Sequence, residues 1–453
     1  MNLFEYQNKE QFSGSLENLE GFLDDIWEQR EKKHLYSDSE LEVIETQQFL
    51  QVFHKTKELK SNKYTGVIHF EGHKINLLPK IFYEADRQYK EEDICCMQAH
   101  ILWWLSYCRK IKFPSYRTSM GSMKSDFFEV LVYLFAKYTN RLLFSSIYQQ
   151  YEEEEKEVAF IKGRLNINEY IHENLARGRW HKLNCAYDIF AFDNKFNRII
   201  KYVASMLLNV TRNFENKNML REIIFILDEV SDCKPTVRDC QNIRFNPLFS
   251  EFETVRDYCM LFLNNSISYE YKNALKLFAF LLPMEYVFED FIFGFIDREV
   301  KEVNASSQVS SKHLDKEEIF VLRPDMLLNT GSRQIIADTK YKVIYSEVED
   351  PKKGISQGDL YQMLSYAVRF KIKDVILFYP DTVQGYRNSP SQINIKDEFA
   401  ENIDVNIRAY QLPIINHQLF RDAYAGSNNL SDMFESTKAE LKERIRSILT
   451  EQS

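Results

Sequence analysis

The last third of the chain alternates apolar segments of helix length with apolar segments of strand length. This order constrains the fold more than any other feature, because a succession of helix, strand, strand, helix and strand predicts a compact α/β unit. In chain order, the expected elements are a helix over Met284–Phe295, strands over Glu317–Leu322 and Gln334–Ala337, a helix over Gly358–Phe370 and a strand over Asp374–Tyr379.

Two acids and a lysine follow the strands of this unit. Pro324-Asp325 comes after the first strand, and Asp338-Thr339-Lys340 comes after the second. Side chains two apart on a strand share a face, so Asp338 and Lys340 are expected to point together and Thr339 away from them. The pattern predicts a metal-dependent nuclease, because carboxylates hold Mg²⁺ against a phosphate and a lysine stabilises negative charge. In this prediction Asp325, Asp338 and the Thr339 carbonyl bind Mg²⁺, and Lys340 orients the attacking water.

Further candidates lie on the helices and beside the lysine. Glu289 is a candidate fourth metal ligand, and Gln362, Tyr366 and Lys342 are candidates for contacts with the substrate. Gln362 and Tyr366 are four residues apart and therefore share one helix face. Other interpretations stay open: a solvated strand end for Asp338 and Lys340, a turn at Asp325, a surface position for Glu289, and a core edge for Gln362 and Tyr366.

The stretch Arg323–Phe370, with RPDMLL, IIADTKYK and GDLYQMLSYAVRF, resembles the nuclease core of the McrC family. These proteins are the endonuclease subunits of McrBC-type, modification-dependent restriction systems, within the PD-(D/E)XK superfamily. Four other segments resemble the family in the same order, so that the resemblance covers most of residues 60–380: Gly66–Ile81, Tyr151–Leu165, Cys185–Lys201 and Met284–Phe291.

The resemblance implies a multidomain protein of the α+β or α/β class. Residues 1–160 would be a domain with a β segment and helices that docks on an McrB-like AAA+ GTPase hexamer, residues 161–270 a helical connecting region, and residues 271–453 the PD-(D/E)XK domain. The implied activity is Mg²⁺-dependent cleavage of modified double-stranded DNA, with two nuclease subunits pairing for a double-strand break. The chain would be activated by the GTPase and would stimulate it, with Lys80 as a candidate stimulating residue. The alternatives are a non-catalytic adaptor that activates an NTPase, and a stand-alone PD-(D/E)XK nuclease in DNA repair.

Composition narrows the function classes further. The 453 residues carry a formal net charge of −9 at pH 7, so weak binding of duplex DNA by the chain alone is expected. The sequence has no Gly-x-x-x-x-Gly-Lys-Ser/Thr loop, so the chain is not expected to hydrolyse a nucleotide in the P-loop manner, and the resemblance implies that the partner uses GTP. Seven cysteines without a Cys-x-x-Cys pair argue against a zinc site and favour a reducing compartment. With no signal-peptide pattern and no apolar run of membrane-spanning length, the expected location is the cytoplasm, without membrane attachment.

The rest of the chain is expected to be mainly helical. Helices are predicted over Leu16–Arg30, Ser39–His54, Asp93–Cys108 and Phe127–Leu143, and over most of residues 166–264. Strands are predicted over Thr65–Leu78, around a turn at Glu71-Gly72-His73.

Overall fold

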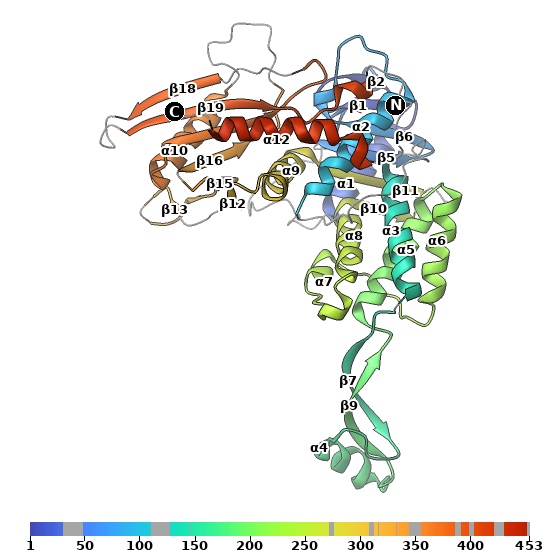
Figure 1. Ribbon diagram of the computed structural model, residues 1–453. Helices are drawn as coiled ribbons and strands as arrows, with labels where there is room; N and C mark the ends of the chain where they lie inside the picture. Colours follow the sequence, from blue (N-terminus) through green and yellow to red (C-terminus); the bar gives the residue numbers. More distant parts are fainter. Residues whose placement is uncertain are drawn as a thin grey trace. The chain divides into compact units, whose positions relative to one another are not determined.

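The computed structural model is a mixed α/β protein, as the sequence predicts (Figure 1). It describes residues 1–29, 49–109, 127–145, 147–270, 276–307, 312–315, 317–331, 333–343, 355–385, 391–397, 403–420 and 430–450. Two compact units share the chain: Met1–Val130 together with Asn264–Ser453 forms the first, and Leu131–Leu263 forms the second. The second unit is therefore an insertion in the first. The domain boundaries at residues 160 and 270, which the family resemblance implies, separate expected functions and not compact units, and they stay a prediction.

A five-stranded sheet in the first unit joins residues from distant parts of the chain. Its strand order is β1 (Asn2–Phe4), β6 (His73–Leu78), β5 (Tyr64–Phe70), β11 (Lys276–Pro283) and β10 (Ser266–Glu270). β5 and β6 form the predicted hairpin around Glu71-Gly72, where both residues have positive φ. β11 lies antiparallel to β5, and a Cβ at Gly66 would lie 1.9 Å from the carbonyl oxygen of Phe280. The pairing of these two strands therefore requires glycine at position 66.

Helix α1 and a small sheet build a core beside these strands. α1 (Leu16–Gln29) confirms the first predicted helix, and the small sheet has the order β2 (Lys9–Gln11), β4 (Glu58–Ser61), β3 (Leu50–Phe53). The helix predicted over Ser39–His54 is wrong at Leu50–Phe53, which pairs antiparallel with β4. A short apolar run fits the helical and the strand period equally well, so this segment could not be assigned from spacing. Residues 39–48 lie outside the described residues.

The residue after β1 is a buried acid, Glu5, which is 1 % exposed. Its Oε2 accepts a hydrogen bond from the backbone N–H of Lys80 at 3.1 Å. Burial raises the pKa of Glu5 to about 8, although the charge and the backbone N–H of Lys80 act in the opposite direction. Tyr341 and Glu285 also face this carboxyl group, and the Glu285 charge contributes to the raised pKa.

Glu5 is expected to make the stability of the first unit depend on pH. Its pKa in the folded protein lies above the ordinary value of 4.5, so the stabilisation is fully present below that pH and is lost as the pH rises through about 8. Between about pH 5 and about pH 9, we expect the wild type to lose on the order of 3 kcal/mol relative to Glu5→Gln. Denaturant unfolding of both proteins across this range measures the difference. Parallel pH profiles for the two proteins would contradict the burial of an ionisable Glu5.

Helices α2 (Glu91–Tyr107) and α9 (Met284–Glu299) pack closely against each other. At Gly294 of α9, a Cβ would lie 1.9 Å from the carbonyl oxygen of Tyr107. On α2, the Trp103 ring lies 5.2 Å from the ring of Phe291 and stacks at 4.8 Å on the ring of Phe434. Contact on several sides accounts for the apolar character of α2 around most of its circumference.

The predicted α/β unit forms a six-stranded sheet in the first unit. Its order is β12 (Asn304–Ser307), β15 (Met326–Asn329), β16 (Gln334–Thr339), β17 (Asp374–Pro380), β19 (Ile403–Leu412) and β18 (Ser391–Asp397). β16, β17 and β19 are parallel, whereas β12, β15 and β18 run antiparallel to their neighbours. Helix α10 (Gln357–Phe370) lies between β16 and β17 in the chain and shares a core with them. The short elements that complete the first unit are η2 (Lys80–Phe82), η6 (His417–Phe420), α11 (Leu430–Met433) and α12 (Glu435–Thr450).

Four of the five elements predicted for this unit are confirmed, and the strand over Glu317–Leu322 is shorter than expected. Only β14 (Val321–Leu322) forms, paired with β13 (Lys312–His313). The Asp315 carboxylate accepts hydrogen bonds from the backbone N–H groups of Ile319 and Phe320, at 3.1 and 2.8 Å. These donors are therefore used in a turn and not in a strand ladder.

The second unit combines a helical part with a projecting β structure. Its helices are α3 (Phe127–Ser145), which starts just before the boundary, α5 (Lys195–Val210), α6 (Phe214–Ile226), α7 (Val237–Gln241), η5 (Pro247–Phe249) and α8 (Phe252–Asn265). The other part, which we call the arm, spans residues 150–191 and contains β7 (Gln150–Val158), β8 (Arg164–Leu165), α4 (Ile167–Glu169), η3 (Tyr170–Asn174), η4 (Leu175–Arg177) and β9 (Leu183–Ala191). Figure 1 shows β7 and β9 leaving the helices of this unit, with α4 at their far end.

The middle region is helical from Lys195 onward, as predicted, but strand β9 was not expected. β9 pairs antiparallel with β7 along its full length. β7 contains the run Glu152–Glu155, and glutamate is depleted in strands, so no partner for β9 was visible in the sequence.

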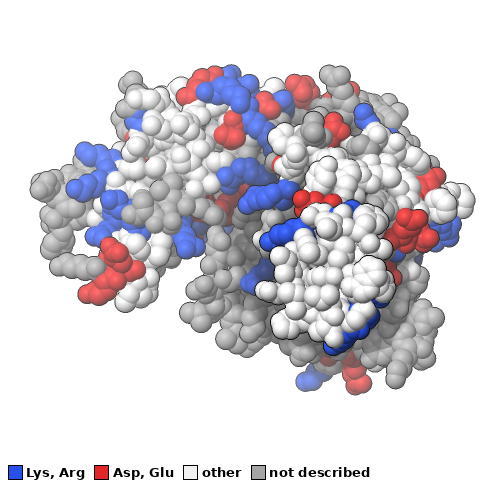
Figure 2. Space-filling view, turned by 90° about the horizontal axis from the view of Figure 1, so that it is seen from below, with Lys and Arg blue, Asp and Glu red and all other residues white. Residues whose placement is uncertain are grey.

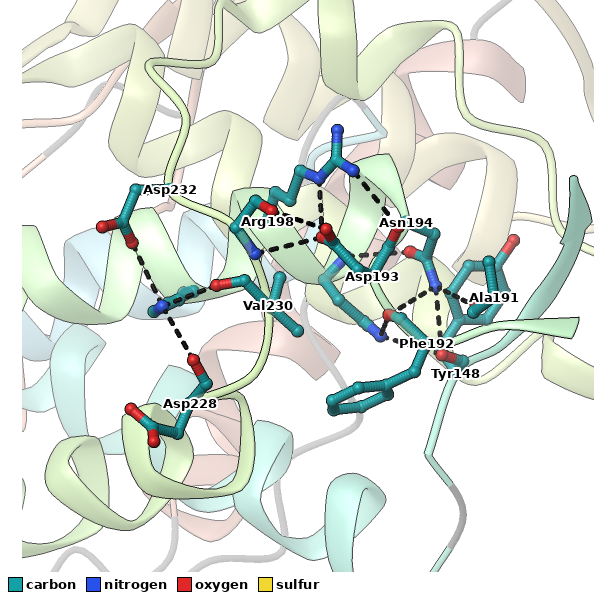
Figure 3. Close-up of polar contacts among 12 residues, drawn as sticks. Tyr148, Ala191, Phe192, Asp193, Asn194, Arg198, Asp228, Val230 and Asp232 are labelled. Carbon is teal, nitrogen blue, oxygen red and sulfur yellow. Dashed lines mark hydrogen bonds and ion pairs between the residues drawn. The ribbon is translucent and has the colours of Figure 1, made fainter. Parts of the chain in front are cut away.

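Polar contacts fix the base of the arm to α5 (Figure 3). The Asn194 side chain accepts a hydrogen bond from the N–H of Asn197 and donates to the carbonyls of Tyr148 and Ala191, at 3.0, 3.2 and 3.2 Å. Beside it, the Arg198 guanidinium lies 2.7 Å from the Asp193 carboxylate. One helix cap thus holds the ends of both long strands.

Among the described residues, no helix combines the length and the apolar character needed to span a bilayer.

Candidate nuclease site

The carboxyl end of β16 brings a buried acid and a lysine together. Asp338 is 1 % exposed, and its Oδ2 lies 2.5 Å from Nζ of Lys340. Ile336, two residues earlier on the same strand face, belongs to the core between the sheet and α10. Asp338 and Lys340 therefore point together on the α10 face, as strand alternation predicts, and they are not a solvated strand end.

Asp325 joins this pair from the segment between β14 and β15. Its Oδ2 accepts hydrogen bonds from the backbone N–H of Thr339 at 2.7 Å and from Oγ1 of Thr339 at 2.8 Å. Asp325 is thus bound to Thr339, the residue between Asp338 and Lys340. The alternative in which Asp325 only opens a turn does not account for these two hydrogen bonds. The Thr339 side chain, expected to point away from the site, serves to anchor Asp325.

Burial and mutual repulsion shift the proton affinities of the three charged groups. Burial and the neighbouring charge of Asp325 together raise the pKa of Asp338 to about 7, against the opposing effect of Lys340. Burial also raises the pKa of Asp325. Burial alone would lower the pKa of Lys340, but the Asp338 and Asp325 charges outweigh it, so the pKa is raised. Two adjacent buried carboxylates favour a bound cation, which would offset their repulsion.

The donor set fits Mg²⁺ better than a metal that needs a complete protein cage. Asp338 Oδ2 is buried, and its charged neighbour is Nζ of Lys340 at 2.5 Å. The same part of the chain contains no cluster of three or more His, Cys, Asp or Glu side chains that would enclose a metal. Mg²⁺ usually keeps several waters and binds proteins through one or two carboxylates together with substrate phosphate. The pair Asp325 and Asp338 offers such a site.

Gln362 and Tyr366 hold the lysine in place through a chain of hydrogen bonds. Lys340 Nζ donates to Oε1 of Gln362 at 3.2 Å, and Nε2 of Gln362 donates to the Tyr366 hydroxyl at 2.8 Å. That hydroxyl donates to the carbonyl of Arg323 at 3.1 Å, two residues before Asp325. The chain links the segment that carries Asp325 to Lys340. These two residues therefore position the site, and the substrate contact predicted for them stays a prediction.

Lys342 is engaged within the protein by an acid that sequence reasoning missed. Its Nζ lies 2.9 and 2.6 Å from the two carboxylate oxygens of Asp359, which is buried in the first turn of α10. Ser356, the N-cap of α10, accepts a hydrogen bond from the Asp359 N–H at 3.2 Å. The Asp359 charge also raises the pKa of Asp338. The signal in the sequence was the Ser-x-x-Asp spacing of a helix start, which only marks a cap.

Glu289 lies half-buried on α9, and α9 packs against β16. Its role as a metal ligand stays a prediction.

Comparisons with known proteins agree with this architecture. The family model described as McrBC 5-methylcytosine restriction system component matches residues 59–380, well over half of the chain. No curated protein sequence matches.

Two solved structures resemble the chain. The first is described as a refined half-complex from a tetradecameric assembly of Thermococcus gammatolerans McrB AAA+ hexamers with bound McrC. Its matching chain is 17 % identical, with 99 % of each chain covered and a TM-score of 0.64. The second, the Thermococcus gammatolerans McrBC complex, is 18 % identical over 66 % of this chain and 88 % of that chain, with a TM-score of 0.48. The first likeness shows that the fold extends over the full chain, and the matched family model gives the assignment: the chain belongs to the family of McrBC 5-methylcytosine restriction system components.

Proposed function

We propose that this chain is the endonuclease subunit of an McrBC-type restriction system and hydrolyses phosphodiester bonds of modified DNA with Mg²⁺. The observation that carries the proposal is the meeting of Asp325, Asp338 and Lys340 at the carboxyl end of β16. An acid pair with an adjacent lysine is the minimum that a PD-(D/E)XK site needs, and all three members are present. The site is complete, which favours a nuclease over a non-catalytic adaptor.

Each residue has a distinct task in this chemistry. Asp325 and Asp338 provide carboxylate oxygens to the cation, and the Thr339 carbonyl is a third candidate oxygen. When bound, Mg²⁺ lowers the pKa of a water and neutralises phosphate charge. Lys340 orients the attacking water and stabilises the extra negative charge on the phosphate oxygens as the new P–O bond forms and the ester bond breaks. Gln362 and Tyr366 keep Nζ of Lys340 in place during this step.

The charge of the chain favours DNA binding that depends on a partner. The formal net charge is −9, and Figure 2 shows a face on which Lys and Arg side chains lie in separate groups with Asp and Glu among them. A duplex-binding protein usually presents a continuous basic face. We therefore assign the holding of DNA to an McrB-like AAA+ GTPase that also binds GTP. The first similar structure, in which McrC is bound to McrB hexamers, supports this partner.

We place a contact with the partner on the far end of the arm. This end exposes several large apolar side chains, among them Phe160, Ile161, Ile167 and Trp180, of which Trp180 is 70 % and Phe160 is 69 % exposed. Contiguous exposed apolar side chains mark protein-interaction surfaces in soluble proteins. Of these four residues, Phe160 lies within residues 1–160, the segment that the family resemblance assigns to docking, and the other three lie in the segment that it assigns to the connecting region.

The double variant Phe160→Ser/Trp180→Ser is expected to weaken binding to the partner at least about tenfold, because aromatic anchors dominate protein interfaces. Phe225→Ser is the matched control, since Phe225 lies on α6 and is 81 % exposed. Titration of the labelled chain with the GTPase measures the affinity. Equal affinities for the double variant and the wild type would remove the arm from the interface.

The proposed activity is tested by DNA cleavage with the purified chain and Mg²⁺, with and without the GTPase and GTP, on methylated and unmethylated duplex. Cleavage of methylated DNA that needs partner, GTP and Mg²⁺ supports the proposal. Cleavage by the chain alone points to a stand-alone nuclease of the same superfamily. Stimulation of the GTPase without any cleavage identifies an adaptor.

A further inference from the structure

The turn Pro79-Lys80-Ile81, which follows the N-terminal hairpin, reaches the edge of the six-stranded sheet where the candidate site lies. Nζ of Lys80 lies 4.5 Å from the centre of the Tyr341 ring, just after β16. The Ile81 carbonyl accepts a hydrogen bond from the N–H of Val383, just after β17, at 3.0 Å. One turn of the N-terminal part thus contacts the carboxyl ends of two adjacent parallel strands.

Tyr341 occupies the centre of a tight turn that begins at the site lysine, Lys340. The N–H of Lys342 donates to the carbonyl of Lys340 at 2.8 Å, a three-residue turn around Tyr341. The N–H of Lys340 donates in turn to the carbonyl of Phe378 on β17 at 2.8 Å. Because the turn is so short, a shift of Tyr341 would also move the backbone of Lys340, the residue that follows β16.

The Tyr341 ring is held by residues from outside the sheet. It is buried, lies 5.9 Å from the Phe288 ring of α9, and has its hydroxyl beside the carboxyl group of Glu5. Lys80 Nζ lies near two rings, 4.5 Å from that of Tyr341 and 5.6 Å from that of Tyr6. A cation near two aromatic faces is attracted by both.

The backbone next to Glu5 is also held in a defined conformation. Tyr6 has φ of 60°, in the left-handed region that bulky residues rarely adopt. Its N–H donates to the Ser61 carbonyl at 2.9 Å, which holds this conformation. A strained residue that its surroundings hold in place typically serves a defined geometry.

We propose that Glu5, Lys80 and Tyr341 form a positioning site for Lys340, through which the N-terminal sheet sets the rate of phosphodiester cleavage. The inference rests on the proposed nuclease function. It gives Lys80 a role inside the protein, different from the stimulation of the partner for which the sequence made it a candidate. A movement of β1 or of the Pro79-Lys80-Ile81 turn would change the placement of Lys340 without any change in the metal ligands.

The test uses the full chain with its GTPase partner and compares Lys80→Met and Tyr341→Phe with the wild type. Both variants are expected to lower kcat for DNA cleavage about ten- to hundredfold, as removal of supporting residues around metal sites does. KM for DNA and the Mg²⁺ concentration for half-maximal rate are expected to stay unchanged. Lys80→Arg, which keeps a cation near the rings, is expected to restore most of the rate. Lys63→Met and Tyr83→Phe are matched controls, because Lys63 lies over the ring of Tyr64 and Tyr83 packs on Phe4.

A second measurement needs no catalysis and therefore separates this inference from the proposed function. In the wild type the Lys340 side chain is 17 % exposed and paired with Asp338. Its rate of acetylation by acetic anhydride, followed by peptide mass spectrometry, is expected to rise several-fold in Lys80→Met and in Tyr341→Phe but not in the controls. Unchanged kcat and unchanged acetylation in both variants would overturn the positioning role. A loss of kcat that Lys80→Arg does not restore would overturn it as well. If the wild type does not cleave DNA, the proposed function fails, and acetylation alone decides the positioning role.

Discussion

Asp338→Asn is expected to abolish DNA cleavage while the chain still folds and binds its partner. Asparagine keeps the shape of the side chain but removes the charge that would hold the cation beside Asp325. Loss of a metal ligand removes several kcal/mol of transition-state stabilisation, which corresponds to a rate at least about 10³-fold lower. A cleavage time course on methylated duplex, with partner, GTP and Mg²⁺ present, measures the loss.

The matched control is Asp297→Asn, the same change at an exposed acid of α9. This variant should cleave at the wild-type rate. Circular dichroism and stimulation of the partner GTPase report whether Asp338→Asn is folded and docked. Cleavage by Asp338→Asn within about tenfold of the wild type would contradict the metal site, because Asp338 is the buried acid that faces Asp325 there.

Gly294→Ala is expected to destabilise the first unit by about 3 kcal/mol, since overpacking of a close-packed contact has costs of this size. A methyl group at this position would lie 1.9 Å from the carbonyl oxygen of Tyr107, so α2 and α9 would have to move apart. The obstructing atom belongs to the backbone, and no side-chain rotation can relieve the contact. Denaturant unfolding of the wild type and the variant gives the difference in the free energy of unfolding.

Gly21→Ala is the matched control, because Gly21 lies in helix α1 with no atom within 4 Å of an added Cβ. Alanine is the better helix former, so this variant should be more stable than the wild type by about 0.5–1 kcal/mol. An equal response of the two variants would show that the close approach of α2 and α9 is not what requires glycine at position 294.

The α/β unit of the last third could be predicted from the sequence because its signals are local. Gln334–Thr339 and Asp374–Pro380 contain short apolar runs bounded by polar residues or proline, and the α10 helix has clear apolar periodicity. Strand alternation correctly placed Asp338 and Lys340 on one face. The resemblance to McrC proteins rested on motifs in their order, and the family match confirms it.

Features that depend on contacts between distant segments could not be predicted. Strand β9 forms because it pairs with the glutamate-rich β7, whose composition gives no strand signal. In the sequence, Asp359 looks like any acid in the first turn of a helix. The contact with Lys342 exists only in the folded structure. The contact between Glu5 and Tyr341 joins residues that lie far apart in the sequence, which no local pattern records.

The pairing of β5 with β11 has a consequence for synthesis on the ribosome. Thr65 and Leu282, which face each other across these strands, are separated by 217 positions. At ordinary elongation rates, roughly ten to forty seconds pass between the emergence of the two strands. The inserted unit can fold during this interval, since all of its residues lie between them. Until β11 is synthesised, the β5 edge of the N-terminal hairpin has no partner strand. During this time the nascent chain can bind chaperones or aggregate.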